Sequence, residues 1–69
     1  MRRDPVVSSN ILSIGYDAST ETLEIEFQTG AVYQYYNVPS SVFETLMAAP
    51  SKGQFFASQI RNSYPFARV

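Results

Sequence analysis

The stretch that decides the fold is Phe27–Pro39, with the sequence FQTGAVYQYYNVP. It reads as the end of one strand, a tight turn, a second strand and a proline that cannot donate to a sheet. Gly30 tolerates a left-handed backbone because it has no Cβ atom. Two hairpins fit this turn: a two-residue loop of Thr29 and Gly30, or a three-residue loop with a bulge at Gly30, in which Phe27 pairs with Ala31.

The length of this loop decides which side chains face the core, because a shift of one residue turns a strand over. The two-residue loop places Gln34 on the apolar face, where a buried unpaired amide costs roughly 1–3 kcal/mol. The bulged loop places Gln34 beside Glu24 and Glu26 on an outer, solvated face, and it directs Tyr33 and Tyr35 to the core. We therefore predict the bulged hairpin.

The residues before the turn alternate between apolar and polar side chains in two segments. The segment Thr22–Gln28, TLEIEFQ, has an apolar residue at every second position, which is typical of a strand with one buried face. The segment Ile11–Tyr16 alternates in the same way, except that Ile11 falls on the other face and marks either a bulge or a strand covered on both sides. With Ala31–Tyr36 as the third strand, the short links predict an antiparallel meander.

Two helices are predicted after the meander. Ser41 and Glu44 have the spacing of a capping box, in which the serine caps the helix start and the glutamate reaches back to it. Ser51 and Gln54 repeat this spacing, and the second helix is expected over Lys52–Arg61. Apolar side chains at helical spacing give each helix a face that packs on the sheet.

These elements form one α+β domain over residues 1–69, in which two helices pack on one face of a three-stranded antiparallel meander. Residues 1–8 are expected to be a loose lead-in, and Tyr64–Val69 is compatible with a short fourth strand. The predicted core consists of the apolar residues that these elements turn inward: Leu12, Ile14, Leu23, Ile25, Phe27, Tyr35, Val38, Phe43, Leu46, Phe56 and Ile60.

The composition argues against several classes of site. The chain has no cysteine and no histidine, so it lacks thiolate ligands, the commonest metal ligand and the commonest general base. We therefore expect no metal, no cofactor and no catalytic residue. No apolar run approaches the ~20 residues that span a bilayer. No apolar segment follows Met1–Arg3 as it does in a secretory signal, so we expect a cytoplasmic protein without membrane contact.

A series of short motifs resembles the KTSC domain family over Ser9–Tyr64. The pair Tyr33 and Tyr35, with one residue between them, matches the hallmark of that family. The family occurs alone and at the C-terminus of some lysyl-tRNA synthetases, and it has no established biochemical function. The fusion implies RNA or tRNA as a partner. The other residues that carry the resemblance are Ser9–Ile11, Ile14–Asp17, Leu23, Phe27, Gly30, Val38–Pro39, Ala49, Ser51, Gly53, Phe56 and Ile60.

The formal charges are unevenly distributed, although their sum is only −1. Between residues 16 and 50 every charged side chain is acidic, and after residue 50 every charged side chain is basic. Ser51, Lys52 and Gly53 form the best candidate for an anion site, because a helix start offers unpaired N–H groups and Lys52 adds a full charge. Arg61 and the outward-facing Tyr36 are further candidates for nucleic-acid contact. Each of these residues also fits an ordinary cap or solvated position.

Two functions remain open from the sequence. The first is a small non-catalytic module that binds RNA or another nucleic acid. The alternative is a module that binds a protein partner or a second copy of itself through an open sheet edge. Tyr33 and Tyr35 are expected in the core rather than on a base-stacking platform, because the acids Glu24 and Glu26 on the outer face repel phosphate.

Overall fold

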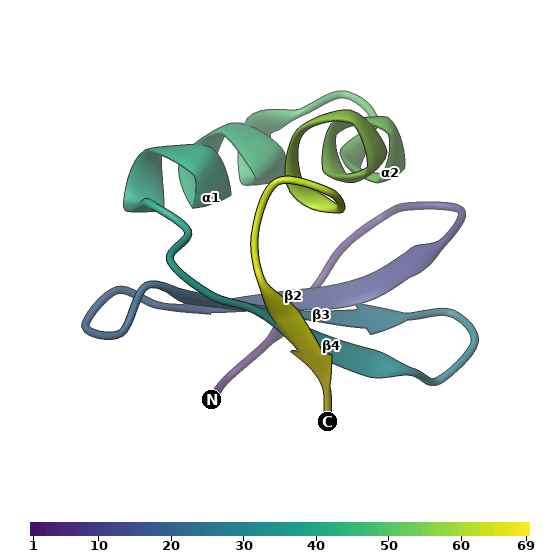
Figure 1. Ribbon diagram of the computed structural model, residues 1–69. Helices are drawn as coiled ribbons and strands as arrows, with labels where there is room; N and C mark the ends of the chain where they lie inside the picture. Colours follow the sequence, from purple (N-terminus) through teal and green to yellow (C-terminus); the bar gives the residue numbers. More distant parts are fainter.

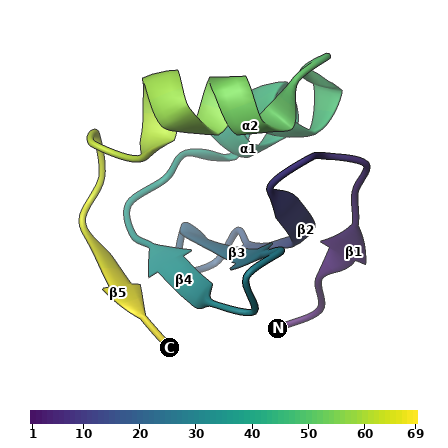
Figure 2. The same ribbon diagram turned by 90° about the vertical axis from the view of Figure 1, so that its right-hand side faces the viewer.

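The computed structural model describes all residues from Met1 to Val69, and it is a two-layer α+β fold (Figure 1). Five antiparallel strands follow the order β1-β2-β3-β4-β5, and the helices lie over one face of the sheet. β1 and β5 form the two edges of the sheet, seen apart in Figure 2. The elements are β1 (Asp4–Pro5), β2 (Ile11–Asp17), β3 (Thr22–Phe27), β4 (Val32–Tyr35), α1 (Ser40–Ala48), α2 (Lys52–Phe55), the π-helical segment η1 (Phe56–Ile60) and β5 (Phe66–Arg68).

The β3–β4 hairpin has the bulged register that the sequence predicts. Leu23 lies opposite Tyr35, and Ile25 lies opposite Tyr33. The N–H of Phe27 donates to the carbonyl oxygen of Ala31 at 2.9 Å. Gly30 has a φ angle of 92°, in the left-handed region that favours glycine. The two tyrosines therefore face the helices, as predicted.

The first predicted strand has a bulge near its start, and this bulge corrects one core assignment. Ile11 pairs with Phe27 while Ser13 pairs with Glu26, so Leu12 is the extra residue. The bulge turns Ile11 into the core and leaves the side chain of Leu12 exposed. Leu12 was wrongly predicted as a core residue because strict alternation takes no account of an inserted residue.

The core lies between the sheet and the helices. Of the other predicted core residues, Phe27 and Phe43 are half-buried at its margin, and the rest are buried. Phe43 stacks on Tyr16 with ring centroids 4.8 Å apart, and the Tyr16 hydroxyl donates to the Val38 carbonyl oxygen. The buried apolar residues are Ile11, Ile14, Leu23, Ile25, Tyr35, Val38, Leu46, Phe56 and Ile60.

The first helix starts differently from the prediction. Pro39 occupies the N-cap position, and no side chain caps the helix. The carbonyl oxygen of Pro39 accepts from the N–H groups of Val42 and Phe43. Because the helix begins directly after this proline, Ser41 lies inside its first turn and cannot cap it. The predicted capping box of Ser41 and Glu44 is therefore wrong.

The second helix matches its predicted range and ends in an unusual turn. Ser51 is its N-cap, and its hydroxyl oxygen accepts from the N–H of Gln54 at 3.3 Å. After Phe55 the helix widens into η1, in which the N–H of Arg61 donates to the carbonyl oxygen of Phe56. Single π turns inside helices are rare and occur frequently at functional sites.

The outer face of the sheet is less solvated than the alternating pattern suggests. Arg3 lies across it, where its Nε donates to the Ser13 hydroxyl oxygen and its guanidinium pairs with Glu24 and Glu26. The amide of Gln34 donates to Glu24 at 2.9 Å. Glu24 is consequently only 7 % exposed. The prediction of a solvated Glu24 was wrong, because periodicity in β3 cannot reveal a distant arginine.

The N-terminal segment also differs from the expected loose lead-in. Asp4 pairs with Ile14 and Pro5 with Ser13, so this segment adds the strand β1. A Cβ atom on Gly15 would lie 2.5 Å from the carbonyl oxygen of Arg2. The absence of a side chain at Gly15 is therefore what allows the segment to cross the sheet.

A truncation at the centre of the core tests this packing. Phe56 is buried and meets Phe27 and Tyr35 with ring centroids 5.4 and 5.3 Å away. Phe56→Ala should lower the free energy of unfolding by about 3–5 kcal/mol. Phe66, which is 57 % exposed, provides a matched control, and Phe66→Ala should cost under about 1 kcal/mol. Equal costs in urea denaturation would contradict this account.

The ion pair of the outer face makes stability depend on pH. Burial alone would raise the pKa of Glu24, but hydrogen bonds from Gln34 and Arg3 and the charge of Arg3 lower it below its ordinary value of 4.5. The stability that this carboxylate contributes is therefore present above pH 4.5 and is lost as the pH falls through the lowered folded-state pKa.

Arg3→Ala should lower the free energy of unfolding by about 1–3 kcal/mol at neutral pH, because it leaves a buried carboxylate short of partners. The difference from the unmodified chain should shrink below pH 4.5. Arg2→Ala is the control, because Arg2 is exposed and pairs only with Asp4 at the surface. Its effect should stay within about 0.5 kcal/mol. A deficit of Arg3→Ala that stays constant with pH would refute the coupling to Glu24.

Candidate functional site

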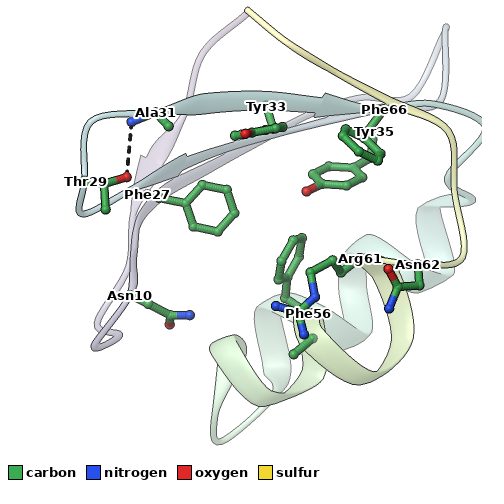
Figure 3. Close-up of a pocket in the computed structure, with 11 residues that line it drawn as sticks. Asn10, Phe27, Thr29, Ala31, Tyr33, Tyr35, Phe56, Arg61, Asn62 and Phe66 are labelled. Carbon is green, nitrogen blue, oxygen red and sulfur yellow. Dashed lines mark hydrogen bonds between the residues drawn. The ribbon is translucent and has the colours of Figure 1, made fainter.

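A pocket of about 620 Å³ opens between the β3–β4 hairpin and the second helix. In Figure 3, Tyr33 and Tyr35 lie on the sheet side, and Phe56 and Arg61 lie on the helix side. Asn10 lies at the left of the view, away from Asn62 and Phe66. The volume falls within the roughly 300–1,000 Å³ of typical small-molecule sites. The pocket is lined by Asn10, Phe27, Thr29, Ala31, Tyr33, Tyr35, Phe56, Ala57, Arg61, Asn62 and Phe66.

Five aromatic rings form the apolar part of the pocket, and they come from β3, β4, η1 and β5. Phe27 meets Tyr33 at an interplanar angle of 81°, and it meets Phe56 at 67°. Tyr35 meets Phe56 at 76°. Phe66 lies against both tyrosines, with centroids 5.9 and 5.7 Å away. The edge-to-face contacts of Phe27 and Phe56 are a favourable geometry for aromatic pairs.

The sheet register explains why Phe66 belongs to this cluster. Tyr35 pairs with Phe66 across β4 and β5, and Tyr33 pairs with Arg68. Directly paired residues of an antiparallel sheet lie on the same face. Phe66 and Arg68 therefore project on the side of the helices, where Phe66 completes the aromatic wall.

The polar groups of the pocket carry one formal charge, and it is positive. Arg61 supplies the guanidinium, while Asn10, Asn62 and Thr29 contribute neutral amide and hydroxyl groups. Burial, and to a lesser extent Tyr33, raises the pKa of the Tyr35 hydroxyl above its ordinary 10.0, which Arg61 partly opposes. Tyr35 is accordingly a neutral phenol at physiological pH.

A second, shallower hollow of about 380 Å³ adjoins the pocket. Its lining consists of Ser9, Asn10, Ser51, Gly53, Gln54 and Ala57. Asn10 and Ala57 line both hollows, so the two form one continuous surface. No acidic residue lines either of them.

Close approach of two segments shapes the second hollow. A Cβ atom on Gly53 would collide with the side-chain oxygen of Asn10. Ser8 holds that oxygen by donating a hydrogen bond to it at 3.1 Å. Glycine at position 53 thus lets the loop before β2 lie directly against the first turn of α2.

The structure brings together three of the five predicted nucleic-acid contacts. Ser51 and Gly53 line the second hollow, and Arg61 lines the aromatic pocket. The ammonium of Lys52 donates to the carbonyl oxygen of Ala49 at 3.2 Å and lines neither hollow. Tyr36 lies apart from them on the outer face, where its hydroxyl donates to the Gln34 side chain.

The motif tyrosines Tyr33 and Tyr35 contact both the hydrophobic core and the pocket. Tyr35 is buried in the core and Tyr33 is half-buried at its margin, yet both line the pocket. Sequence reasoning predicted their inward direction and missed the hollow in front of them. It also missed Asn10 and Phe66, because these residues reach the pocket only through tertiary contacts.

The structure contains neither a cluster of metal-ligating side chains nor a membrane-spanning helix. No group of three or more carboxylates, histidines or cysteines is placed to hold a metal ion. Neither helix has the length and apolar character needed to cross a bilayer. The side chains that line the site are aromatic rings, amides, hydroxyls and one guanidinium.

Comparison with known proteins identifies relatives of the whole domain. The sequence model of a family described as "KTSC domain" matches residues 7–64. A lysine–tRNA ligase of Nostoc punctiforme is 46 % identical over 61 residues, which is 88 % of this chain and 11 % of the ligase. The chain thus spans about a tenth of the ligases that it matches. A protein of Stutzerimonas stutzeri is 43 % identical over 81 % of this chain and 79 % of its own length.

A solved structure has the same fold. The crystal structure of a KTSC domain protein from Yersinia pestis superimposes with a TM-score of 0.96 at 43 % sequence identity. The match covers 99 % of this chain and 96 % of that protein. The domain therefore occurs both as a small protein and as a part of much longer chains.

Proposed function

The chain belongs to the KTSC domain family, and we propose that it is a non-catalytic module that binds single-stranded RNA. The proposed binding surface consists of the two adjoining hollows beside the second helix. Ser51, Gly53 and Arg61 are its polar contacts with the backbone of the strand, and Tyr33 and Tyr35 belong to its aromatic part.

The charge of this surface is the observation that carries the proposal. The two hollows are lined by five aromatic rings, several amides and hydroxyls, and one base, with no acid among them. Single-strand binding proteins combine a positive groove for the backbone with aromatic side chains for the bases. The acids Glu24 and Glu26 lie on the outer face and are paired with Arg3, so they do not oppose a phosphate bound near Arg61.

The relatives favour RNA over other polyanions. Several of them are lysine–tRNA ligases, enzymes named for a tRNA substrate. Because the chain matches only about a tenth of each ligase, a tRNA ligand for this domain is part of the proposal. The specific recognition of RNA commonly targets single-stranded loops and ends.

Lys52 extends the proposed surface in a secondary role. It stands between Ser51 and Gly53, which both line the second hollow. A lysine ammonium has three N–H donors, and the bond with Ala49 occupies one of them. The remaining donors are available to a phosphate at the start of α2, so we assign Lys52 a contact beside the hollow rather than within it.

A protein partner is the second candidate function, and β5 is the observation in its favour. β5 lies at the sheet edge, and all three of its residues are exposed. An open edge of this kind accepts a strand from another chain through backbone hydrogen bonds. The opposite edge, β1, is shorter and contains Pro5, which cannot donate. Strand addition depends little on salt, whereas phosphate binding weakens steeply with it.

Removal of the charge in the pocket tests the RNA proposal. Arg61→Gln should weaken binding of a short RNA single strand and reduce the slope of log affinity against log salt by about one unit. Arg2→Gln is the charge-matched control, since Arg2 is exposed and pairs with Asp4 rather than lining a hollow. It should leave both quantities unchanged. Fluorescence anisotropy at several salt concentrations provides the measurement.

Lys52→Glu supplies a second arm of the same experiment. A carboxylate in the first turn of a helix is favourable, so the fold should survive the loss of the hydrogen bond to Ala49. RNA affinity should fall nonetheless. If the unmodified protein binds neither RNA nor DNA at low salt, the proposal is wrong and the strand-addition candidate takes its place.

A further inference from the structure

The aromatic pocket has a shape that suits a flat ring. Phe56 meets Phe27 and Tyr35 edge to face, and all three rings line the pocket. A hollow of about 620 Å³ remains in front of them. Phe66 lines the pocket and is 57 % exposed, so much of its ring is available to a ligand. A planar aromatic guest complements such walls through stacked or edge-on contacts.

The charge of the pocket excludes one common class of guest for aromatic clusters. Rings that surround an ammonium group bind it through cation–π attraction. Here the only charged lining residue is Arg61, which repels a cation. The pocket also contains no carboxylate that offsets this repulsion. A neutral ring attached to an anion meets both the aromatic and the electrostatic requirement.

The polar side chains that line the pocket can form hydrogen bonds with the edge of a planar ring. Asn62 follows η1, and Asn10 lies on the loop before β2, so two amides approach the pocket from different elements. Each amide offers both donors and an acceptor. The edges of nucleobases present the complementary mixture, and asparagine pairs with them in protein–nucleic acid complexes. The neutral Tyr35 hydroxyl is a further lining group.

We infer that this pocket holds one unstacked nucleobase of a single strand, with the adjacent phosphate beside Arg61 and toward the second hollow. The inference rests on the proposed RNA-binding function and adds a defined site to it. The ring of Phe66 stacks on the base, Asn10 and Asn62 contact its edge, and Arg61 contacts the backbone. The strand then continues over Ala57 toward Ser51 and Gly53, which line the adjoining hollow.

A short RNA strand with one 2-aminopurine tests this site, together with an abasic strand of the same length. Binding should quench the 2-aminopurine fluorescence, because the base stacks on aromatic rings. The abasic strand should bind about 5- to 150-fold more weakly, the range that corresponds to the stacking of one base. Phe66→Ala should weaken binding of the base-containing strand at least about 5-fold. It should leave the affinity for the abasic strand unchanged.

A second variant and a free nucleotide keep the test decisive. Asn62→Ala, at an exposed position, should reduce base-dependent affinity even if Phe66→Ala disturbs β5. Equal affinity for the two strands would overturn the base site while RNA binding stands. Failure of every strand to bind, with adenosine monophosphate still shifting the amide signals of the pocket, would overturn RNA binding and retain the base site. If only an extended acidic peptide binds, the RNA-binding proposal and the base site are both wrong.

Discussion

The rest of the structure depends on the register of the β3–β4 hairpin. The left-handed backbone of Gly30 and the bond from Phe27 to Ala31 fix this register. A slip of one residue would turn both motif tyrosines outward and bring Gln34 into the core. The same slip would take Gln34 away from Glu24, to which its amide donates on the outer face. One turn therefore determines the core, the aromatic pocket and the outer polar network together.

The two faces of the sheet differ in the charged side chains that lie on them. On the outer face, Arg3 pairs with Glu24 and Glu26, and Gly15 leaves room for the segment that carries Arg3. On the side of the helices, Arg61 is the only charge in the two hollows. Although the net charge of the chain is −1, the only formal charge in this local surface is positive. Local arrangement rather than overall charge governs recognition at short range, because salt screens distant charges.

Local patterns predicted most of the fold and little of the site. The alternation in β3 and the glycine turn were sufficient for the meander, and the spacing of Ser51 and Gln54 was sufficient for the second helix start. Pattern reasoning failed where distant segments meet. The bulge at Leu12 and the place of Arg3 over Glu24 depend on tertiary contacts that periodicity does not contain. The pocket was missed for the same reason, since its rings come from four separate elements.

Chemical-shift mapping of the isotope-labelled protein during titration with an unstructured RNA strand tests the central claim most directly. The account predicts that the shifted amides cluster around the pocket and the second hollow, at Phe27, Tyr33, Phe56, Arg61 and Gly53, while the outer face stays unchanged. Shifts confined to the outer face around Glu24 and Tyr36, or to the free edge of β5, would contradict it.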